Sequence, residues 1–191
     1  MTKPIVLYAV ALTTLSACAA DPNPPTVSRS DVDRAYAEAQ RIERLPETSL
    51  IELPTGTVTY DGQIGANVSG DANGDILADM TMIVGFGSGD VDGTVDNINL
   101  IDPDGTPNQR FDGDLDIDGD VRNGEINADA EGEITGVDVD GFVVDSRMEL
   151  NLDGTVRDDV INGDTVFGDA EGTARGDFDM NIDGVFFGAQ R

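Results

Sequence analysis

The chain has 191 residues, with 38 acidic side chains against 11 basic ones and a formal net charge of −27. It contains no His and a single Cys. It therefore cannot build a Ser/His/Asp triad, a Cys/His nucleophile pair, a His/Cys zinc site or a disulfide framework. Nucleic acids and anionic lipid surfaces attract basic side chains. The large negative charge therefore argues against both as partners.

The first 17 residues have the order of a secretory signal peptide. Lys3 supplies a basic start, residues 5–15 are mostly apolar, and small residues precede Cys18. The sequence LSAC at 15–18 resembles the lipobox of bacterial lipoproteins, which implies that Cys18 is lipidated and begins the mature chain. Ala19 follows in place of the Asp that retains such lipoproteins in the inner membrane. The resemblance implies a lipid anchor in the outer membrane, with an ordinary buried Cys18 as the alternative.

A tether and a helix are expected next. Residues 18–28 predict a lipidated Cys followed by a proline-rich, extended tether, and residues 29–46 predict one amphipathic helix. Ser30 is the expected N-cap, and Pro46 ends the pattern. Because the apolar stripe is narrow, we expect a packing element or spacer rather than a functional device. Its members recur at steps of three and four residues: Val32, Ala35, Tyr36, Ala39, Ile42 and Leu45.

From residue 53 onward the apolar period changes to two, which is typical of β-strands. Apolar side chains occupy the even positions from 76 to 86, opposite Asp79 and Thr81. A later change of parity predicts a β-bulge near Asn97. Between residues 111 and 121 the odd positions are apolar or Gly, and every even position is Asp. This segment therefore predicts a strand with one apolar and one acidic face.

Asn123-Gly124 predicts a two-residue hairpin turn, because both central residues of a type I′ turn need a positive φ. The turn pairs residue 121 with 126 and residue 117 with 130, so the apolar faces coincide. It also sets acidic side chains directly opposite one another, which destabilises a sheet. The expected acidic pairs are Asp118 with Asp129, Asp116 with Glu131 and Asp114 with Glu133.

Residues 53–191 predict an all-β domain, an eight-stranded antiparallel barrel whose interior is filled by side chains. A membrane-spanning barrel would face apolar residues outward and carry aromatic girdles. Aromatic residues are only 5% of this chain and Trp is absent, so we expect a soluble barrel, apolar inside and acidic outside. Recurring Asp-Gly and Asn-Gly pairs predict the turns: they begin at Asp61, Asn73, Asp92, Asp104, Asp153, Asn162 and Asp183.

The opposed carboxylates form a candidate cation site, which we call the acidic ladder. Part of it fits the EF-hand loop pattern, but an EF-hand needs a flanking helix on each side, and prolines, glycines and a two-residue period occupy those places. A looser site for Ca²⁺ would relieve the cross-strand repulsion. The alternative is an acidic face that is simply solvated. The ladder consists of Asp114, Asp116, Asp118, Asp129, Glu131 and Glu133.

Catalysis by paired carboxylates is a weaker interpretation. A glycosidase needs one acid with a raised pKa and a partner at a defined separation. With 38 acidic residues, proximity between carboxyl groups is expected by chance. Nothing in the sequence marks a cleft, an electrophile or an aromatic sugar platform, so we expect no enzymatic activity.

Three segments carry a family resemblance. Residues 53–62 read LPTGTVTYDG, residues 84–95 read VGFGSGDVDGTV, and residues 184–188 read GVFFG. They resemble strands of the β-barrel domain in bacterial surface lipoproteins of the transferrin-binding protein B type. The resemblance covers residues 53–191 and implies an eight-stranded barrel on a lipid-anchored stalk that captures a protein. The family's Glu-x-Gly-Gly-Thr-Phe element and handle domain are not matched, and no residue here matches a known partner contact.

Together these features predict a non-enzymatic outer-membrane lipoprotein whose barrel is a binding module for a protein or small solute. Loops such as residues 101–110 are the expected contact surface. Nutrient or iron acquisition is the role that the family resemblance implies. The alternative is a structural or divalent-cation-binding envelope lipoprotein. The expected partners are the membrane, through the lipid at Cys18, and an unidentified ligand, but no nucleic acid.

Overall fold

The computed structural model describes residues 21–191 except residue 162. The predictions made for residues 1–17, for Cys18 and for Asn162 therefore lie outside the described residues. No helix in the described part is both long and apolar enough to cross a membrane. The elements are α1 (Arg29–Glu43), β1 (Thr57–Gly70), β2 (Gly74–Gly85), β3 (Asp90–Ile101), β4 (Pro107–Arg110), β5 (Leu115–Arg122), β6 (Glu125–Val137), β7 (Val143–Arg157), β8 (Thr165–Gly176) and β9 (Met180–Gln190).

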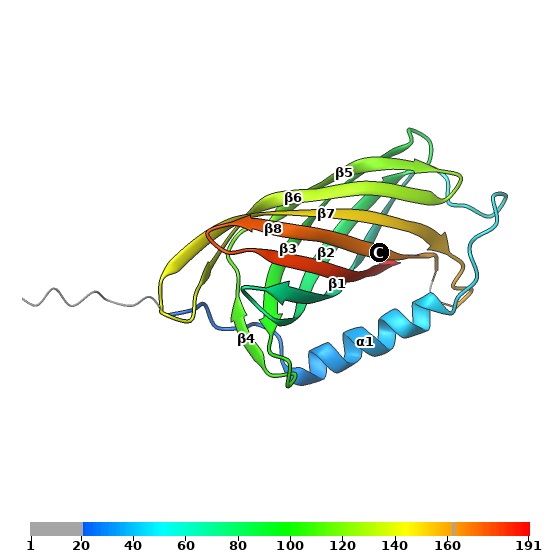
Figure 1. Ribbon diagram of the computed structural model, residues 1–191. Helices are drawn as coiled ribbons and strands as arrows, with labels where there is room; N and C mark the ends of the chain where they lie inside the picture. Colours follow the sequence, from blue (N-terminus) through cyan, green and yellow to red (C-terminus); the bar gives the residue numbers. More distant parts are fainter. Residues whose placement is uncertain (1–20, 162) are drawn as a thin grey trace, which may run out of the picture.

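The strands form one closed antiparallel β-barrel (Figure 1). Strands that follow one another in the chain pair with each other, except that β4 and β5 both pair with β3, one after the other along its length. Pairing of β1 with β9 closes the barrel. Because β4 and β5 share one position, the barrel has eight strand positions, and the predicted eight-stranded barrel is confirmed.

The up-and-down order sorts the connections to two ends of the barrel. The β1–β2, β3–β4, β6–β7 and β8–β9 loops lie at one end, which we call the open end. The β2–β3, β5–β6 and β7–β8 loops lie at the other, which we call the far end. The segment that follows α1 also reaches the far end, where Leu53 packs against the core beside the Gly124 turn.

The predicted hairpin is confirmed in its turn and its register. Asn123 and Gly124 have φ values of 55° and 84°, as a type I′ turn requires. Val121 faces Ile126, and Ile117 faces Ala130. The predicted bulge near residue 97 is confirmed as well. The pairing of β2 with β3 shifts between Leu77 and Asp79, opposite an Asn97 with φ of 50°.

The interior is apolar, as the alternation predicts, but several predicted turns are wrong. Asp61, Asp92, Asp153 and Asp183 lie within β1, β3, β7 and β9, so their Asp-Gly pairs do not turn the chain. In each pair the Asp points outward and the Gly lies on the inner face, between buried apolar neighbours. Inward glycines leave room for large rings in a narrow barrel. The fully buried Phe186 ring, for example, fills the space beside two glycines of β7 and β8.

Helix α1 begins at residue 29 as predicted, but its N-cap and its end differ from the prediction. The N-cap is Ser28 rather than Ser30, because the Asp31 carboxylate accepts a hydrogen bond from the Ser28 backbone N–H (2.7 Å) in a capping box. Hydrogen bonds from the Ser28 hydroxyl and then from its backbone N–H lower the pKa of Asp31 below its ordinary value. The helix ends at Glu43, three residues before Pro46.

The helix packs against the outside of the barrel, where Figure 1 shows it lying along the strands. Ala35, Ala39 and Ile42 are buried, whereas Tyr36 is 68% exposed and was wrongly placed on the packing face. The three buried helix residues belong to a second apolar cluster, together with outward-pointing side chains of four strands. That cluster includes Leu77, Ile101, Phe167 and Phe187.

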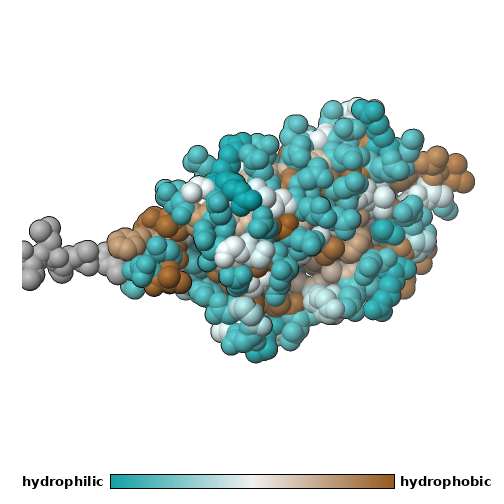
Figure 2. Space-filling view, viewed as in Figure 1, coloured by the Kyte–Doolittle hydropathy of each residue, from teal (hydrophilic) through white to brown (hydrophobic). Residues whose placement is uncertain are grey.

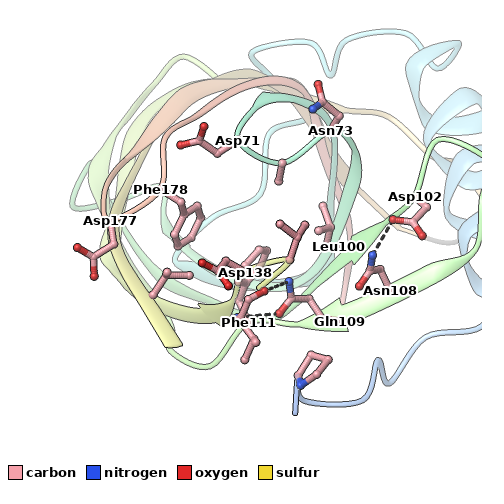
Figure 3. Close-up of a pocket in the computed structure, with 15 residues that line it drawn as sticks. Asp71, Asn73, Leu100, Asp102, Asn108, Gln109, Phe111, Asp138, Asp177 and Phe178 are labelled. Carbon is pink, nitrogen blue, oxygen red and sulfur yellow. Dashed lines mark hydrogen bonds between the residues drawn. The ribbon is translucent and has the colours of Figure 1, made fainter. Parts of the chain in front are cut away.

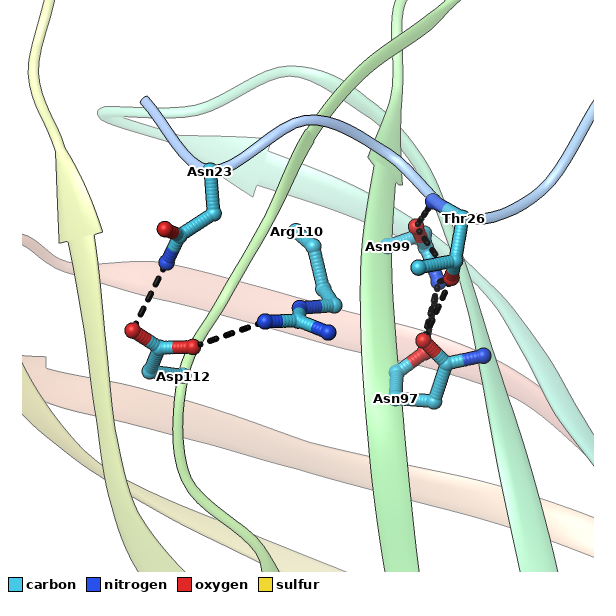
Figure 4. A network of polar contacts seen from close by, with 6 residues as sticks. All are labelled: Asn23, Thr26, Asn97, Asn99, Arg110 and Asp112. Carbon is cyan, nitrogen blue, oxygen red and sulfur yellow. Dashed lines mark hydrogen bonds and ion pairs between the residues drawn. The ribbon is translucent and has the colours of Figure 1, made fainter. Parts of the chain in front are cut away.

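The described part of the predicted tether, residues 21–28, is fastened to the barrel (Figure 4). The Asn23 side chain donates a hydrogen bond to the Asp112 carboxylate (2.7 Å). The Thr26 backbone N–H donates to the side-chain oxygen of Asn99 (2.9 Å), which is fully buried. These contacts hold the segment against the barrel wall, so in this part it does not act as a free spacer.

Candidate functional site

A cavity of about 640 Å³ lies at the open end of the barrel (Figure 3). All four loops of that end contribute to its wall, together with side chains from the ends of β3, β4, β6 and β7. Pro22, at the start of the described chain, borders it as well. We call this feature the mouth cavity. Its volume lies within the range of about 300–1,000 Å³ that is usual for small-molecule pockets.

Two aromatic rings are among the groups that line the mouth cavity. Phe111 and Phe178 stack with ring centroids 5.7 Å apart and an angle of 10° between their planes. Both rings are almost fully buried. The buried Ser146 hydroxyl donates to the Phe178 carbonyl (2.7 Å) and accepts from its N–H (3.3 Å), which fixes this end of the loop. The rings therefore offer a preformed apolar surface to a ligand.

Four carboxylates surround the opening: Asp71, Asp102, Asp138 and Asp177. Each also accepts a hydrogen bond from within its own end of the barrel, such as the one from the Asp179 N–H to Asp71 (2.8 Å). No Arg or Lys is among the described residues that line the cavity. The electrostatic potential at the opening is therefore negative, which favours a ligand that carries positive charge.

Gln109 closes a gap in the barrel wall beside the cavity. Its side-chain amide donates to the Val137 carbonyl (3.0 Å), and its side-chain oxygen accepts from the Val137 N–H (3.0 Å). The amide thus replaces a pair of ladder hydrogen bonds where β4 lies apart from β6. The predicted contact segment 101–110 does border the cavity, through Asp102, Asn108 and Gln109.

Two groups with raised pKa values, Tyr60 and Asp164, lie at the far end of the barrel, away from the mouth cavity. Burial, and then the Asp164 carboxylate, raise the pKa of Tyr60, whose hydroxyl has no hydrogen-bond partner among the described residues. Desolvation raises the pKa of Asp164; a hydrogen bond from Thr48 (3.4 Å) opposes the shift, and the nearby Asp158 adds to it. No described contact connects these groups to the cavity.

The acidic ladder forms in the predicted register. Asp116 faces Glu131 and Asp118 faces Asp129, whereas residue 114 precedes β5 and lies outside the ladder pairing. β3 adds a further carboxylate, since Asp92 faces Asp118 from the other side. Asp92 was missed because β4 separates β3 from β5 in the sequence, although the two strands pair directly in the sheet.

The acidic ladder has a cationic partner within the protein, the guanidinium group of Arg147. Arg147 of β7 pairs with Glu131 and with Glu149 (2.8 Å). A shallow depression beside it is lined by Asp116, Asp118, Asp129 and Glu131, but not by the predicted Asp114 and Glu133. Within residues 21–191 except 162, no three acidic, His or Cys side chains are placed to hold a metal ion. The expected Ca²⁺ therefore has no ligand set in the described part.

Sequence reasoning missed the mouth cavity itself. It placed residue 111 on an apolar face, yet nothing local indicates that the Phe111 ring meets the Phe178 ring across the barrel. The one available signal was the clustering of Asp in the segments at 71, 102, 138 and 177, which the up-and-down order brings to the same end.

Comparisons with protein-family models, with curated proteins and with solved structures found no match to this chain. The fold and the site nevertheless define a class: a small up-and-down β-barrel with a filled interior and a ligand-sized opening at one end. The predicted relationship to transferrin-binding protein B lipoproteins stays a prediction.

Proposed function

We propose that the protein is a non-enzymatic outer-membrane lipoprotein, anchored through Cys18, whose barrel binds a small cationic amphiphile in the mouth cavity. One observation carries the proposal: stacked aromatic rings and four carboxylates line the same cavity, with no basic side chain among the described lining residues. Apolar surface gains free energy on leaving water, and cations are attracted both to carboxylates and to aromatic faces.

A binding role agrees better with this cavity than catalysis does. The polar groups that line its described part are Asp carboxylates and Asn or Gln amides, so it lacks the hydroxyl, thiol and amine nucleophiles of covalent catalysis. The resemblance to surface lipoproteins of the transferrin-binding protein B type also implies capture rather than chemistry. The cavity volume of about 640 Å³ favours a small solute over the protein partner that this resemblance implies.

Isothermal titration calorimetry with decyltrimethylammonium tests the proposal, with decyl sulfate as an anion of the same tail length. Only the cation is expected to bind. In the variant Asp71→Asn/Asp177→Asn the affinity for the cation should fall about tenfold, which corresponds to about 1.4 kcal/mol. Each Asn keeps one side-chain oxygen that can accept the existing backbone hydrogen bond, so loss of the charge is the main change.

The matched control is Asp116→Asn/Asp129→Asn, which removes the same charge from the acidic ladder on the barrel wall. It should leave the affinity unchanged. Equal binding of the two detergents, or equal weakening by the two double variants, would show that the cavity does not select a cationic amphiphile.

A further inference from the structure

The β6–β7 loop, residues 138–142, and the first residue of β7 present exposed apolar side chains at the open end. Val139 is 101% exposed, Phe142 62% and Val143 58%. Figure 2 shows apolar surface at the end of the molecule where the described chain begins. Apolar side chains grouped on an otherwise polar surface indicate a contact with a partner.

Hydrogen bonds hold this loop in shape. The Asp138 carboxylate accepts hydrogen bonds from the N–H groups of Asp140 (2.9 Å) and Phe142 (2.8 Å). The Asp138 N–H donates in turn to the Phe142 carbonyl (2.9 Å). The apolar side chains are therefore presented outward by a fixed turn, so binding needs little further ordering of the backbone.

The start of the described chain lies at the same end. Pro22 borders the mouth cavity together with Val139, and Asn23 is hydrogen-bonded to the barrel. Cys18 precedes Asp21 by three peptide links, so at 3.8 Å per link their Cα atoms are at most about 11 Å apart. A lipid on Cys18 therefore brings the open end of the barrel to the membrane.

The far end also carries exposed apolar residues, and chain length decides between the two ends. Ile51 is 95% exposed, Val160 88% and Ile161 85%. The 15-residue strand β7 separates residues 143 and 157, a path of roughly 45 Å along the strand. A lipid held near Asp21 cannot place this second group at the same membrane surface.

We infer that the β6–β7 loop docks on the lipid bilayer, with Val139, Phe142 and Val143 in the headgroup region and the mouth cavity facing the membrane. The inference rests on the lipid anchor of the proposed function. Interfacial segments bury their apolar side chains about 5–10 Å into the headgroup and acyl boundary. In this orientation an amphiphile enters the cavity along the membrane surface.

Charge determines which lipids suit the docked end. Asp71, Asp138 and Asp177 surround the opening, and Asp140 lies on the loop itself. Anionic headgroups repel these carboxylates at low ionic strength. The docking surface therefore fits a zwitterionic bilayer, and phosphatidylglycerol is expected to weaken the contact.

Single-tryptophan reporters test the orientation, because the natural chain contains no Trp. The variant Phe142→Trp is compared with Ile51→Trp in the lipidated full-length protein, reconstituted in phosphatidylcholine vesicles with and without brominated phospholipid. The F142W reporter is expected to shift to shorter wavelength and to be quenched several-fold more than the I51W reporter. Phosphatidylglycerol added to the vesicles should reduce that difference.

Equal quenching of both reporters, or stronger quenching of I51W, would overturn the proposed docking. A wavelength shift that depends on protein concentration without vesicles would assign the loop to a second copy instead. Partition into Triton X-114 reports the anchor separately. If the protein stays in the aqueous phase, the anchor is wrong, and the same reporters are then read with the Cys18 thiol coupled to a maleimide phospholipid.

Discussion

Two outer faces of the same barrel differ in what covers them. Across β3, β5 and β6, outward carboxylates lie in a row, Asp92 beside Asp118 beside Asp129, and face solvent. Across β8 and β9, outward Phe167 and Phe187 lie under α1. Both faces follow the same two-residue alternation. Alternation therefore decides which side chains leave the barrel interior, and a separate element decides whether they meet water.

The largest effect is expected from uncovering the apolar face. Ile42 of α1 is 1% exposed and packs in the cluster with Phe167 and Phe187. The substitution Ile42→Ala should lower the free energy of unfolding by about 2–5 kcal/mol, because it removes buried methylene groups and leaves a cavity. Urea denaturation followed by circular dichroism measures the change.

The control lies on the same helix. Tyr36→Ala removes a side chain that is 68% exposed, and should change the free energy of unfolding by no more than about 0.5 kcal/mol. A similar loss for both variants would mean that α1 is stabilised by its own helical structure rather than by the barrel face that it covers.

On the acidic face, removing a charge should stabilise the protein. Asp118 lies between Asp92 and Asp129, and like charges directly opposite each other destabilise a sheet. Asp118→Asn is expected to raise the free energy of unfolding by about 0.2–1 kcal/mol at low salt. The gain should disappear near 1 M NaCl, where the screening length is about 3 Å.

Asp75→Asn provides the comparison, since Asp75 faces Asn67 rather than a carboxylate. Its effect on stability should be smaller than that of Asp118→Asn in low-salt urea titrations. An equal gain in both variants would attribute the effect to overall net charge instead of to the ladder.

The smallest effect is expected at Asp164, where desolvation rather than repulsion is the main cost of the charge. Its pKa is raised in the folded state, so the folded protein holds this proton more tightly than the unfolded chain does. The corresponding stability is present below the ordinary value of 3.8 and is lost as the pH rises through the folded pKa.

Asp164→Asn should therefore be slightly more stable than the natural protein near neutral pH, and the difference should vanish below about pH 3. Thermal unfolding across this pH range measures it. In contrast to the gain from Asp118→Asn, this gain should persist in high salt. A difference that grows as the pH falls would contradict the assigned cause.

Prediction from the sequence succeeded where the information is local. The Asn123-Gly124 turn, the register of β5 with β6 and the bulge at Asn97 all depend on neighbouring residues, and all are confirmed. It failed where a local pattern has two meanings. Asp153-Gly154 has the composition of a turn, yet in β7 it places Asp outside and Gly inside the barrel.

The sequence by itself determined the two-residue alternation, the hairpin turn and the lack of His chemistry, because each depends on residue types and short spacings. Only the tertiary structure decided which distant side chains meet inside the barrel and on its outer faces. The Phe111–Phe178 stack, the pairing of Asp92 with Asp118 and the place of α1 all join segments far apart in the chain. Such contacts depend on barrel closure and packing, which no short stretch of sequence encodes.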